Sequence, residues 1–447
     1  MARLFGTDGV RGIANGRVLS AELALALGRA AVAFARERGA SLPEIVIGRD
    51  TRRSGALLED AFCAGIASAG GVALRAGVLP TPGVALLVRE QGASLGAVIS
   101  ASHNPFPDNG IKLFGPDGFK LLDADEDRIE ALLGAPGELP TGAGVGDSRR
   151  LADAPERYVD WIVSQGFAMP PLRILVDCAH GAAATVAPSL FARLGIAHEL
   201  IGCAPDGVNI NDGVGSTHLG ALAVGVRAGG FDLGIAFDGD ADRMLAVDAD
   251  GSDVDGDQIV ALLARDLQTT GMLRNDTVVV TSMSNLGLHR ALAGLGIRAI
   301  VTDVGDRYVL EAMLEHDAVL GGEQSGHVIA LDRQTTGDGL ISAVLLLDAL
   351  ARTGETLAVA ASLVTRFPQK LVNVRADRTR LAGNRAIWDV VDAENVALAK
   401  SGAGRILLRP SGTESLVRVM VEHEIEGEVE RLCGSITALV ERELGQA

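Results

Sequence analysis

Three short apolar runs, each followed by a small polar turn and then a helical pattern, constrain the fold of this chain most strongly. They occupy residues 45–47, 174–176 and 278–280. Continuous β-branched runs that alternate with helical segments are typical of largely buried strands in α/β layers. Because more than 100 residues separate successive runs, the pattern predicts a repeated domain rather than one large sheet.

The last part of the chain has a different pattern. Residues 371–375, 405–408 and 416–422 read as strands, and residues 427–444 as a long amphipathic helix. The expected domain boundaries are a Gly/Pro-rich surface loop at 134–146 and an acidic, turn-forming segment at 248–257. We therefore predict three related α/β domains at 1–154, 155–253 and 254–368, followed by a smaller α+β domain at 369–447.

Charge and hydropathy limit the partners of this chain. Its formal net charge is -17, which argues against a nucleic-acid or anionic membrane partner. An anionic small substrate would need arginines gathered at its site. No apolar stretch approaches the length of a membrane span, and the N-terminus lacks the apolar core of a secretory signal. We expect a cytoplasmic protein whose four scattered cysteines are reduced thiols.

The strongest local signal is Asp-Gly-Asp-Ala-Asp-Arg at 238–243, directly after an apolar strand at 233–237. Asp238, Asp240 and Asp242 can converge on one hard cation, and without a cation they would repel one another. Magnesium is favoured over zinc because the loop contains no His or Cys. The alternative is a solvated acidic turn.

A second signal is Ala-Ser-His-Asn-Pro at 101–105, after a buried strand that ends near residue 100. The following Asn-Pro fixes a loop in which we expect Ser102 and His103 to be exposed. A phosphorylated Ser102 would add about -1.5 to -2 charges and extra oxygen ligands for a cation. By itself the segment also fits a turn whose Ser and Asn bond only to backbone.

Two further loops carry polar groups suited to a sugar phosphate. Between two strand-like runs, a phosphate dianion could be held by forked guanidinium, hydroxyl and backbone N–H groups of Arg409, Ser411, Gly412, Thr413 and Arg418. A hairpin with surface arginines is the alternative. In the glycine-rich segment 321–327, Glu323 and Ser325 offer hydrogen bonds to sugar hydroxyls, and His327 could transfer a proton or bind phosphate. A loop of this kind binds nothing in most proteins.

Taken together, the four loops resemble those of the α-D-phosphohexomutase superfamily. The superfamily has a Ser-His-Asn-Pro phosphoserine loop, an Asp-Gly-Asp-x-Asp-Arg metal loop, a Gly-Glu-x-Ser-Gly-His sugar loop and an Arg-Pro-Ser-Gly-Thr-Glu phosphate loop. All four occur here in that order, so the resemblance covers essentially all 447 residues. It implies four domains around a central cleft, each domain contributing one loop.

The resemblance also implies residue roles. Ser102 would carry the phosphoryl group and, with the three aspartates, hold one Mg²⁺ per active site. Arg243 would contact the same phosphate. Arg11, Lys112 and His327 are candidates for proton transfer, and His103 belongs with the catalytic residues. The choice of general base stays open.

Segments 5–12, 283–287 and 304–308, with Gln324, look most like the branch of the superfamily that acts on glucosamine phosphates in bacteria; Asp303 departs from its pattern. This implies interconversion of glucosamine 6-phosphate and glucosamine 1-phosphate through a 1,6-bisphosphate, on the route to UDP-N-acetylglucosamine and the cell wall. It also implies a homodimer and, as an activator, glucosamine or glucose 1,6-bisphosphate. The alternatives are a mannose- or glucose-phosphate mutase of the same fold, a metal-dependent sugar phosphatase and a non-catalytic sugar-phosphate-binding protein.

Overall fold

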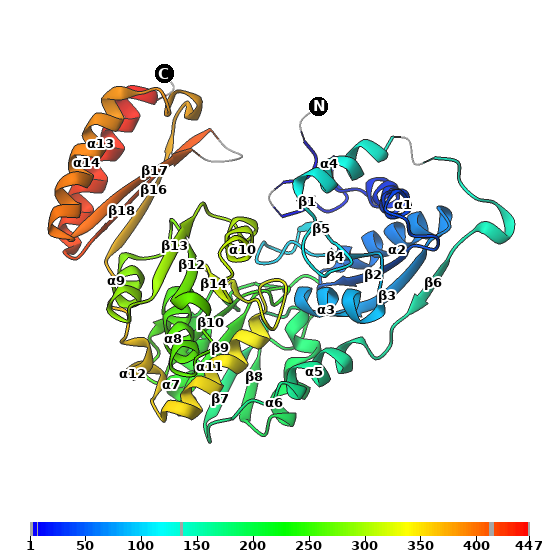
Figure 1. Ribbon diagram of the computed structural model, residues 1–447, viewed down its shortest axis with the longest axis horizontal. Coiled ribbons are helices and arrows are strands. Elements are labelled where there is room, and N and C mark those ends of the chain that lie inside the picture. Colours follow the sequence, from blue (N-terminus) through cyan, green and yellow to red (C-terminus); the bar gives the residue numbers. More distant parts are fainter. Residues whose placement is uncertain (1–2, 7, 135–136, 411–414, 446–447) are drawn as a thin grey trace. The chain divides into compact units, whose positions relative to one another are not determined.

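The computed structural model describes residues 3–6, 8–134, 137–410 and 415–445. These residues pack into two compact units. The larger unit contains the described residues up to Met283 together with Leu295–Leu363, and the smaller contains Ser284–Gly294 with the described residues from Val364 onward. Figure 1 labels most of the helices and strands of both units.

The first predicted strand lies inside a six-stranded sheet. In spatial order its strands are β1 (Val10–Ile13), β5 (Asp108–Phe114), β4 (Leu95–Ile99), β2 (Glu44–Arg49), β3 (Val72–Val78) and β6 (Asp147–Arg150). β2 is parallel to both β3 and β4, whereas β5 runs antiparallel to β4. Because β4 and β5 are antiparallel neighbours, the segment between them turns back at one edge of the sheet, and this segment carries Ser102.

Helices cover both faces of this sheet. They are α1 (Ala21–Glu37), α2 (Arg53–Ser68), α3 (Thr81–Gln91) and α4 (Asp123–Leu132). Leu27, Phe62 and Ile129 from α1, α2 and α4 share one apolar cluster with Ile45 and Ile47 of β2. α3 packs on the opposite face, where a Cβ added at Gly48 would lie 2.4 Å from Val84. Glycine at that position therefore allows close helix–sheet packing.

The second predicted strand belongs to a five-stranded sheet. Its order is β11 (Asp253–Val254), β10 (Met244–Asp248), β9 (Leu233–Phe237), β7 (Arg173–Asp177) and β8 (Ala197–Ile201). The accompanying helices are α5 (Ala154–Ser164), the 3₁₀ helix η2 (Ala182–Thr185), α6 (Ala187–Arg193) and α7 (Gly220–Gly229). Part of the expected acidic joint at 248–257 is thus a hairpin, because β11 pairs with β10.

The third predicted strand is β12 (Thr277–Thr281), in a four-stranded sheet. The sheet order is β13 (Arg298–Thr302), β12, β14 (Leu320–Gly322) and β15 (Val328–Ala330). Its helices are α8 (Gly256–Thr269), α10 (Asp306–Glu315), α11 (Gly339–Thr353) and α12 (Leu357–Ala361), and a 3₁₀ turn, η3 (Arg274–Asp276), precedes β12. Asp255 and Gln258 form a capping box at the start of α8, which fixes where this helix begins.

The smaller unit is a three-stranded antiparallel sheet under two long helices. The strands are β16 (Gln369–Arg375), β18 (Leu416–His423) and β17 (Gly404–Pro410), and the helices are α9 (Leu286–Gly294), α13 (Arg385–Ser401) and α14 (Glu426–Leu444), with a 3₁₀ turn at η4 (Arg378–Arg380). Figure 1 shows α13 and α14 side by side on this sheet. The three predicted strands and the closing helix are confirmed, but α13 was not predicted from the sequence.

One helix groups differently from the sequence-based expectation. α9 follows β12 in the chain, yet it packs with the C-terminal unit. The side chain of Asn285 explains the attachment, since it donates to the carbonyl of Phe367 and accepts from the amide of the same residue. Local sequence gave no signal for this pairing because its partner lies 82 positions away.

The segment expected to form a surface loop at 134–146 includes residues 135–136, which lie outside the described residues. Its described part contains one 3₁₀ turn, η1 (Gly142–Gly144), and leads into the edge strand β6. The four cysteines are free thiols, as predicted. Within the described part of the chain, no helix is long and apolar enough to cross a membrane.

Candidate active site

The acidic loop predicted to hold a metal connects two antiparallel strands. β9 ends at Phe237 and β10 begins at Met244, so the three aspartates lie in the turn between them. Asp238 and Asp240 are 0% exposed and Asp242 is 3% exposed. One carboxylate oxygen from each lies within 4.8 Å of the others. The alternative of a solvated acidic turn is therefore wrong.

The pKa values of two carboxyl groups in this triad are shifted in opposite directions. Burial, followed by the charges of Asp242 and Asp240, raises the pKa of Asp238 well above its usual range. Burial would also raise the pKa of Asp242, but Lys112, His327 and Arg243 hold it well below the usual value. The positive groups around the cluster thus compensate part of its charge.

The arrangement of the triad fits a bound cation. Asp240 Oδ1 and Asp242 Oδ1 are buried and have no hydrogen-bond partner among the described residues. A buried polar atom without a partner is costly, and an ion is one of the few groups that can satisfy it. An all-oxygen donor set of carboxylates suits a hard divalent cation such as Mg²⁺.

Ser102 lies against the triad. Its Oγ donates a 2.5 Å hydrogen bond to Asp238 Oδ2, although the two residues are 136 positions apart. Ser102 adopts a positive φ of 52°. Its side chain was expected to be exposed, but the residue is only 1% exposed because the metal loop of the second sheet covers it. The turn therefore does more than satisfy its own backbone.

His103 is half-buried rather than exposed, and its Nδ1 is 3.4 Å from Ser102 Oγ. Burial, followed by the charges of Arg243 and Arg11, lowers the pKa of this imidazole to about 4. A neutral His103 therefore faces the hydroxyl of Ser102 at neutral pH.

Two cations from the first sheet face the triad. Lys112, on β5, has its Nζ 3.0 Å from Asp240 Oδ2, 3.6 Å from Asp242 Oδ2 and 3.1 Å from Asp8 Oδ2. Arg11 lies on the neighbouring strand β1, opposite Gly110 of β5, and makes an ion pair with Asp8. Burial alone would lower the pKa of Lys112, but the surrounding carboxylates raise it overall. The positive charges of Lys112 and Arg11 thus compensate part of the negative charge of the triad and Asp8.

His327 approaches the triad from the third sheet. Its Nδ1 is 3.7 Å from Asp242 Oδ2, and its Nε2 is 3.8 Å from Asp306 Oδ2. Burial lowers the pKa of His327, but the hydrogen bond and charge of Asp242 raise it overall. Lys120 contacts both Asp306 and Asp8, which joins this group to the cations of the first sheet.

The sugar loop residues are half-buried and bonded to one another. Ser325 Oγ donates to Glu323 Oε2 over 3.3 Å, and Glu323 Oε1 accepts from the amide of Gly305 over 3.0 Å. Arg243 follows the triad, with its Nε 3.8 Å from Asp242 Oδ1. Burial would lower the pKa of Arg243, but Asp242 and Asp238 raise it overall. The larger unit therefore brings together residues from three of the four predicted loops.

The fourth loop lies in the smaller unit. Arg409 on β17 and Arg418 on β18 are direct cross-strand partners. This register places two guanidinium groups at one position of the sheet, as the predicted phosphate site requires. The expected positions Ser411, Gly412 and Thr413 lie outside the described residues.

The similarity of this chain to known proteins extends over nearly its whole length. Residues 2–138, 156–251 and 255–367 match the phosphoglucomutase/phosphomannomutase alpha/beta/alpha domains I, II and III, and residues 371–439 match the C-terminal domain of the same family. The phosphoglucosamine mutase of Symbiobacterium thermophilum is 51% identical over 99% of this chain and 100% of its own length. The chain belongs to the phosphoglucosamine mutase family of phosphohexomutases.

A second relative and two solved structures are also similar to this chain. The phosphoglucosamine mutase of Saccharopolyspora erythraea is 52% identical, covering 98% of this chain and 99% of that protein. Among solved structures, a phosphoglucomutase/phosphomannomutase family protein from Burkholderia thailandensis shares the fold with a TM-score of 0.83 at 24% identity, over 99% of both chains. N-acetylphosphoglucosamine mutase of Aspergillus fumigatus, solved with GlcNAc-6P and magnesium, has a TM-score of 0.63 at 19% identity, covering 81% of this chain and 92% of that one.

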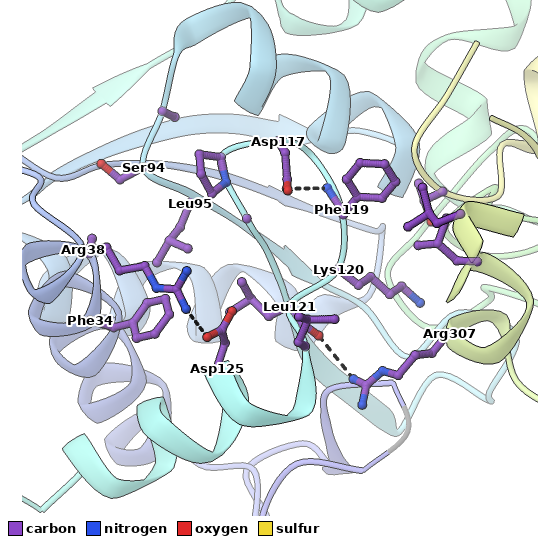
Figure 2. Close-up of a pocket in the computed structure, with 18 of the residues that line it drawn as sticks. Phe34, Arg38, Ser94, Leu95, Asp117, Phe119, Lys120, Leu121, Asp125 and Arg307 are labelled. Atoms are coloured by element: carbon purple, nitrogen blue, oxygen red, sulfur yellow. Dashed lines mark hydrogen bonds and ion pairs between the residues drawn. The ribbon is translucent and has the colours of Figure 1, made fainter. Parts of the chain in front are cut away.

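In this member of the family, a cavity of about 690 Å³ lies beside the charged cluster rather than at it. Figure 2 shows apolar side chains such as Phe34 and Leu95 on its wall, with Arg38 bonded to Asp125. Lys120 and Asp306 also line it, so the cavity meets the charged network at its edge. Neither Ser102 nor the triad contributes to its lining.

Several residues near the site were missed by sequence reasoning. Asp8 and Asp306 lie inside the family segments 5–12 and 304–308, so a signal existed for both. Thr81 had none, yet its Oγ1 donates to Asp240 Oδ2 over 2.7 Å. Asp303, the departure from the family pattern, is exposed and has no contact with the triad among the interactions of the described residues.

Proposed function

We propose that this chain interconverts glucosamine 6-phosphate and glucosamine 1-phosphate through a phosphoserine enzyme and a 1,6-bisphosphate intermediate. The observation that carries the proposal is the hydrogen bond from Ser102 Oγ to Asp238, within a buried carboxylate triad faced by Lys112. A serine that only stabilised a turn would have no reason to lie among three buried acids. Glucosamine phosphate as the substrate is supported by curated phosphoglucosamine mutases that match this chain over nearly its full length at about 50% sequence identity.

We assign Mg²⁺ binding to Asp238, Asp240 and Asp242, with a phosphoserine oxygen of residue 102 as a further ligand. The buried, unpartnered Oδ1 atoms of Asp240 and Asp242 support this assignment. When bound, the ion would neutralise charge on the transferring phosphoryl group. One ion per active site would satisfy the triad.

The chain's own residues position the transfer. Phosphorylated Ser102 presents its phosphorus to the free hydroxyl of the sugar phosphate; the bond from phosphorus to Ser102 Oγ breaks as the bond to the sugar oxygen forms. The proton of that hydroxyl must pass to a group that is unprotonated at the moment of attack, and the serine oxygen takes up a proton as it leaves. Arg11, Lys112 and His327 are the candidates for these proton transfers, and His103 packs beside the serine oxygen. After the bisphosphate turns around, its other phosphate returns to Ser102. Phosphoryl transfer of this kind depends mainly on positioning and charge stabilisation.

Recognition of the sugar phosphate is assigned to the remaining loops. Glu323 and Ser325 would bond to sugar hydroxyls, and Arg243 to the reacting phosphate. Arg409, Ser411, Gly412, Thr413 and Arg418 would bind the phosphate that is not reacting; the cross-strand pairing of the two arginines supports this role. Glucosamine or glucose 1,6-bisphosphate would prime the serine, and a variant of the Aspergillus mutase has been solved with glucose 1,6-bisphosphate.

Steady-state rates with glucosamine, glucose and mannose 6-phosphates test the proposal. We expect the largest kcat/KM for glucosamine 6-phosphate and a phosphate on Ser102 in peptide mass spectra. A preference for mannose or glucose 6-phosphate would show that glucosamine 6-phosphate is not the main substrate. Net release of inorganic phosphate in excess of isomerised product would indicate a phosphatase. Binding without turnover, even after priming, would indicate a sugar-phosphate-binding protein.

We further propose that the chain acts as a homodimer in the cytoplasm and supplies glucosamine 1-phosphate for UDP-N-acetylglucosamine and peptidoglycan precursors. The family assignment supports this setting. Light scattering after size exclusion would test the dimer, since a monomer at enzyme-assay concentrations would contradict it.

A further inference from the structure

Arg52 is a fully buried arginine at the N-cap of α2, and all five of its N–H donors are used. Its Nε donates to Asp50 Oδ2 over 2.8 Å. Nη1 donates to the carbonyls of Pro105 and Asp108, and Nη2 to those of Ser102 and Asn104, over 2.9 and 2.7 Å. Four of the five acceptors are therefore backbone oxygens of the segment that carries the nucleophile. We propose that Arg52 is a positioning residue that fixes the attack geometry of Ser102.

The backbone of Ser102 needs such support. Its φ of 52° lies in the left-handed region, which is strained for a residue with a Cβ. A conformation of this kind persists only when the surroundings determine it by several contacts. Arg52 supplies one of these contacts directly, at the carbonyl of Ser102 itself.

A second contact reaches the amide of Ser102. Asp50 Oδ2 accepts from Ser100 Oγ over 2.6 Å, and Ser100 Oγ in turn accepts from the Ser102 amide over 2.9 Å. Asp50 Oδ1 accepts from the amide of Arg52. Both backbone polar groups of Ser102 are thus tied to one buried ion pair between Arg52 and Asp50, whose side chains are 0% exposed.

The third contact comes from the domain that carries the metal loop. Asn211 Nδ2 donates to the carbonyls of Ser102 and Asn104, over 2.9 and 3.1 Å. A Cβ added at Gly239 would lie 2.6 Å from the Ser102 carbonyl oxygen, so the metal loop packs directly on the same atom. We call the contacts that Arg52, Asp50, Ser100 and Asn211 make with this segment the clamp. The clamp sets the position of Ser102 relative to the carboxylates as well as relative to its own sheet.

Arg52 itself cannot contact a substrate, because its side chain is 0% exposed and its donors are all occupied. Lysine cannot replace it, since an ammonium group has three donors and lacks the planar fork that reaches separate carbonyls. Its removal should displace Ser102 without altering the groups that bind the sugar or its phosphate. A displacement of about 1 Å at a reacting atom can lower the rate about 100-fold.

This inference rests on the proposed mutase function, and the test compares three variants of the full chain with the wild type. In Arg52→Lys, we expect kcat for glucosamine 6-phosphate to fall about 100-fold while KM changes less than threefold. Asn211→Ala removes two bonds and places alanine at a positive φ of 59°, a smaller change than loss of the buried guanidinium; we expect its kcat to fall about tenfold. Arg75→Lys is the matched control, because Arg75 lies on β3 of the same sheet, pairs with Glu59 and Asp60 of α2, and does not touch the Ser102 segment.

Hydrogen exchange of residues 100–109 provides a readout that needs no substrate. We expect faster exchange in this segment in Arg52→Lys and Asn211→Ala, and no change there in Arg75→Lys. Exchange at the wild-type rate in both clamp variants, or a kcat loss equal to that of the control, would overturn the inference. If the wild type does not isomerise hexosamine phosphates but the clamp variants still exchange faster, the clamp stands and the proposed function fails.

Discussion

Ser102 Oγ donates a hydrogen bond to Asp238 Oδ2 across the boundary between the first and second sheets. The serine follows β4 and the aspartate follows β9, so each arrives at the end of a fully buried strand. Their contact links the nucleophile of the proposed reaction to the carboxylates proposed to bind Mg²⁺. The following predictions test what this arrangement does.

Replacing Ser102 by alanine should remove the phosphoryl carrier. We expect Ser102→Ala to lose at least about 1,000-fold in kcat, because no other group can form the covalent phosphoenzyme. Incubation with glucose 1,6-bisphosphate should add one phosphate to the wild type and none to the variant, as measured by intact mass. Phosphate incorporation into the variant would show that another residue is the acceptor.

Loss of one triad carboxylate should abolish stabilisation by Mg²⁺. A ligand at 100 times its dissociation constant stabilises the folded state by about 2.7 kcal/mol, so Mg²⁺ should raise the melting temperature of the wild type. In Asp242→Asn we expect little or no such rise. Asp248→Asn, which alters a carboxylate at the end of the same hairpin, is the control and should keep the response. An equal response in Asp242→Asn would place the ion elsewhere.

Removal of the Lys112 ammonium should destabilise the metal-free protein. Breaking a buried ion pair on one side costs about 3–5 kcal/mol because it leaves the opposite charge unpaired. Lys112→Gln should therefore unfold at lower urea concentration, and Mg²⁺ should restore part of the loss. Lys370→Gln, which breaks an exposed pair with Glu430, should change the midpoint little. A midpoint in Lys112→Gln equal to that of the wild type would contradict the prediction.

Arg418 is predicted to bind the phosphate that is not reacting. Arg418→Ala should lower kcat/KM for glucosamine 6-phosphate about 100-fold, because a forked charge-assisted bond to phosphate is lost. The exposed Arg442 on α14 offers a control in the same unit, and Arg442→Ala should leave kcat/KM unchanged. Equal values for the two variants would remove Arg418 from phosphate recognition.

Asp338 should make stability depend on pH. Burial raises the pKa of its carboxyl to about 6, against about 3.9 in an unfolded chain. The folded state therefore holds the proton more tightly; this contribution is complete below about pH 4 and is lost as the pH rises through about 6.

Asp338→Asn keeps the acceptor for the Ile341 amide and the Tyr158 hydroxyl without a titrating charge. As the pH rises from 4 to 7, the free energy of unfolding of the variant should increase relative to that of the wild type by up to about 3 kcal/mol. Urea denaturation at several pH values measures this difference. Parallel pH profiles for the two proteins would contradict the prediction.

Much of the site could be read from local sequence, because its chemistry is concentrated in short segments. Asp238, Asp240 and Asp242 alternate within one turn, and an apolar strand precedes them, so both their convergence and their preference for a cation could be predicted. The strand–turn–helix pattern was likewise local, and it located β2, β7 and β12 correctly. Asp8 and Asp306 were harder because nothing in their own segments indicates which charges they face.

The four-loop pattern, the family and the strands that carry the loops could all be predicted from the amino-acid sequence, since they depend on periodicity and on residue types a few positions apart. The burial of Ser102, the compensation of the triad by Lys112 and the contacts of Arg52 and Asn211 with the backbone of the nucleophile could be seen only in the folded chain. Each of these contacts joins residues at least 50 positions apart. Burial and long-range hydrogen bonds arise from how the sheets pack against each other, and no local pattern records which side chains that packing brings together.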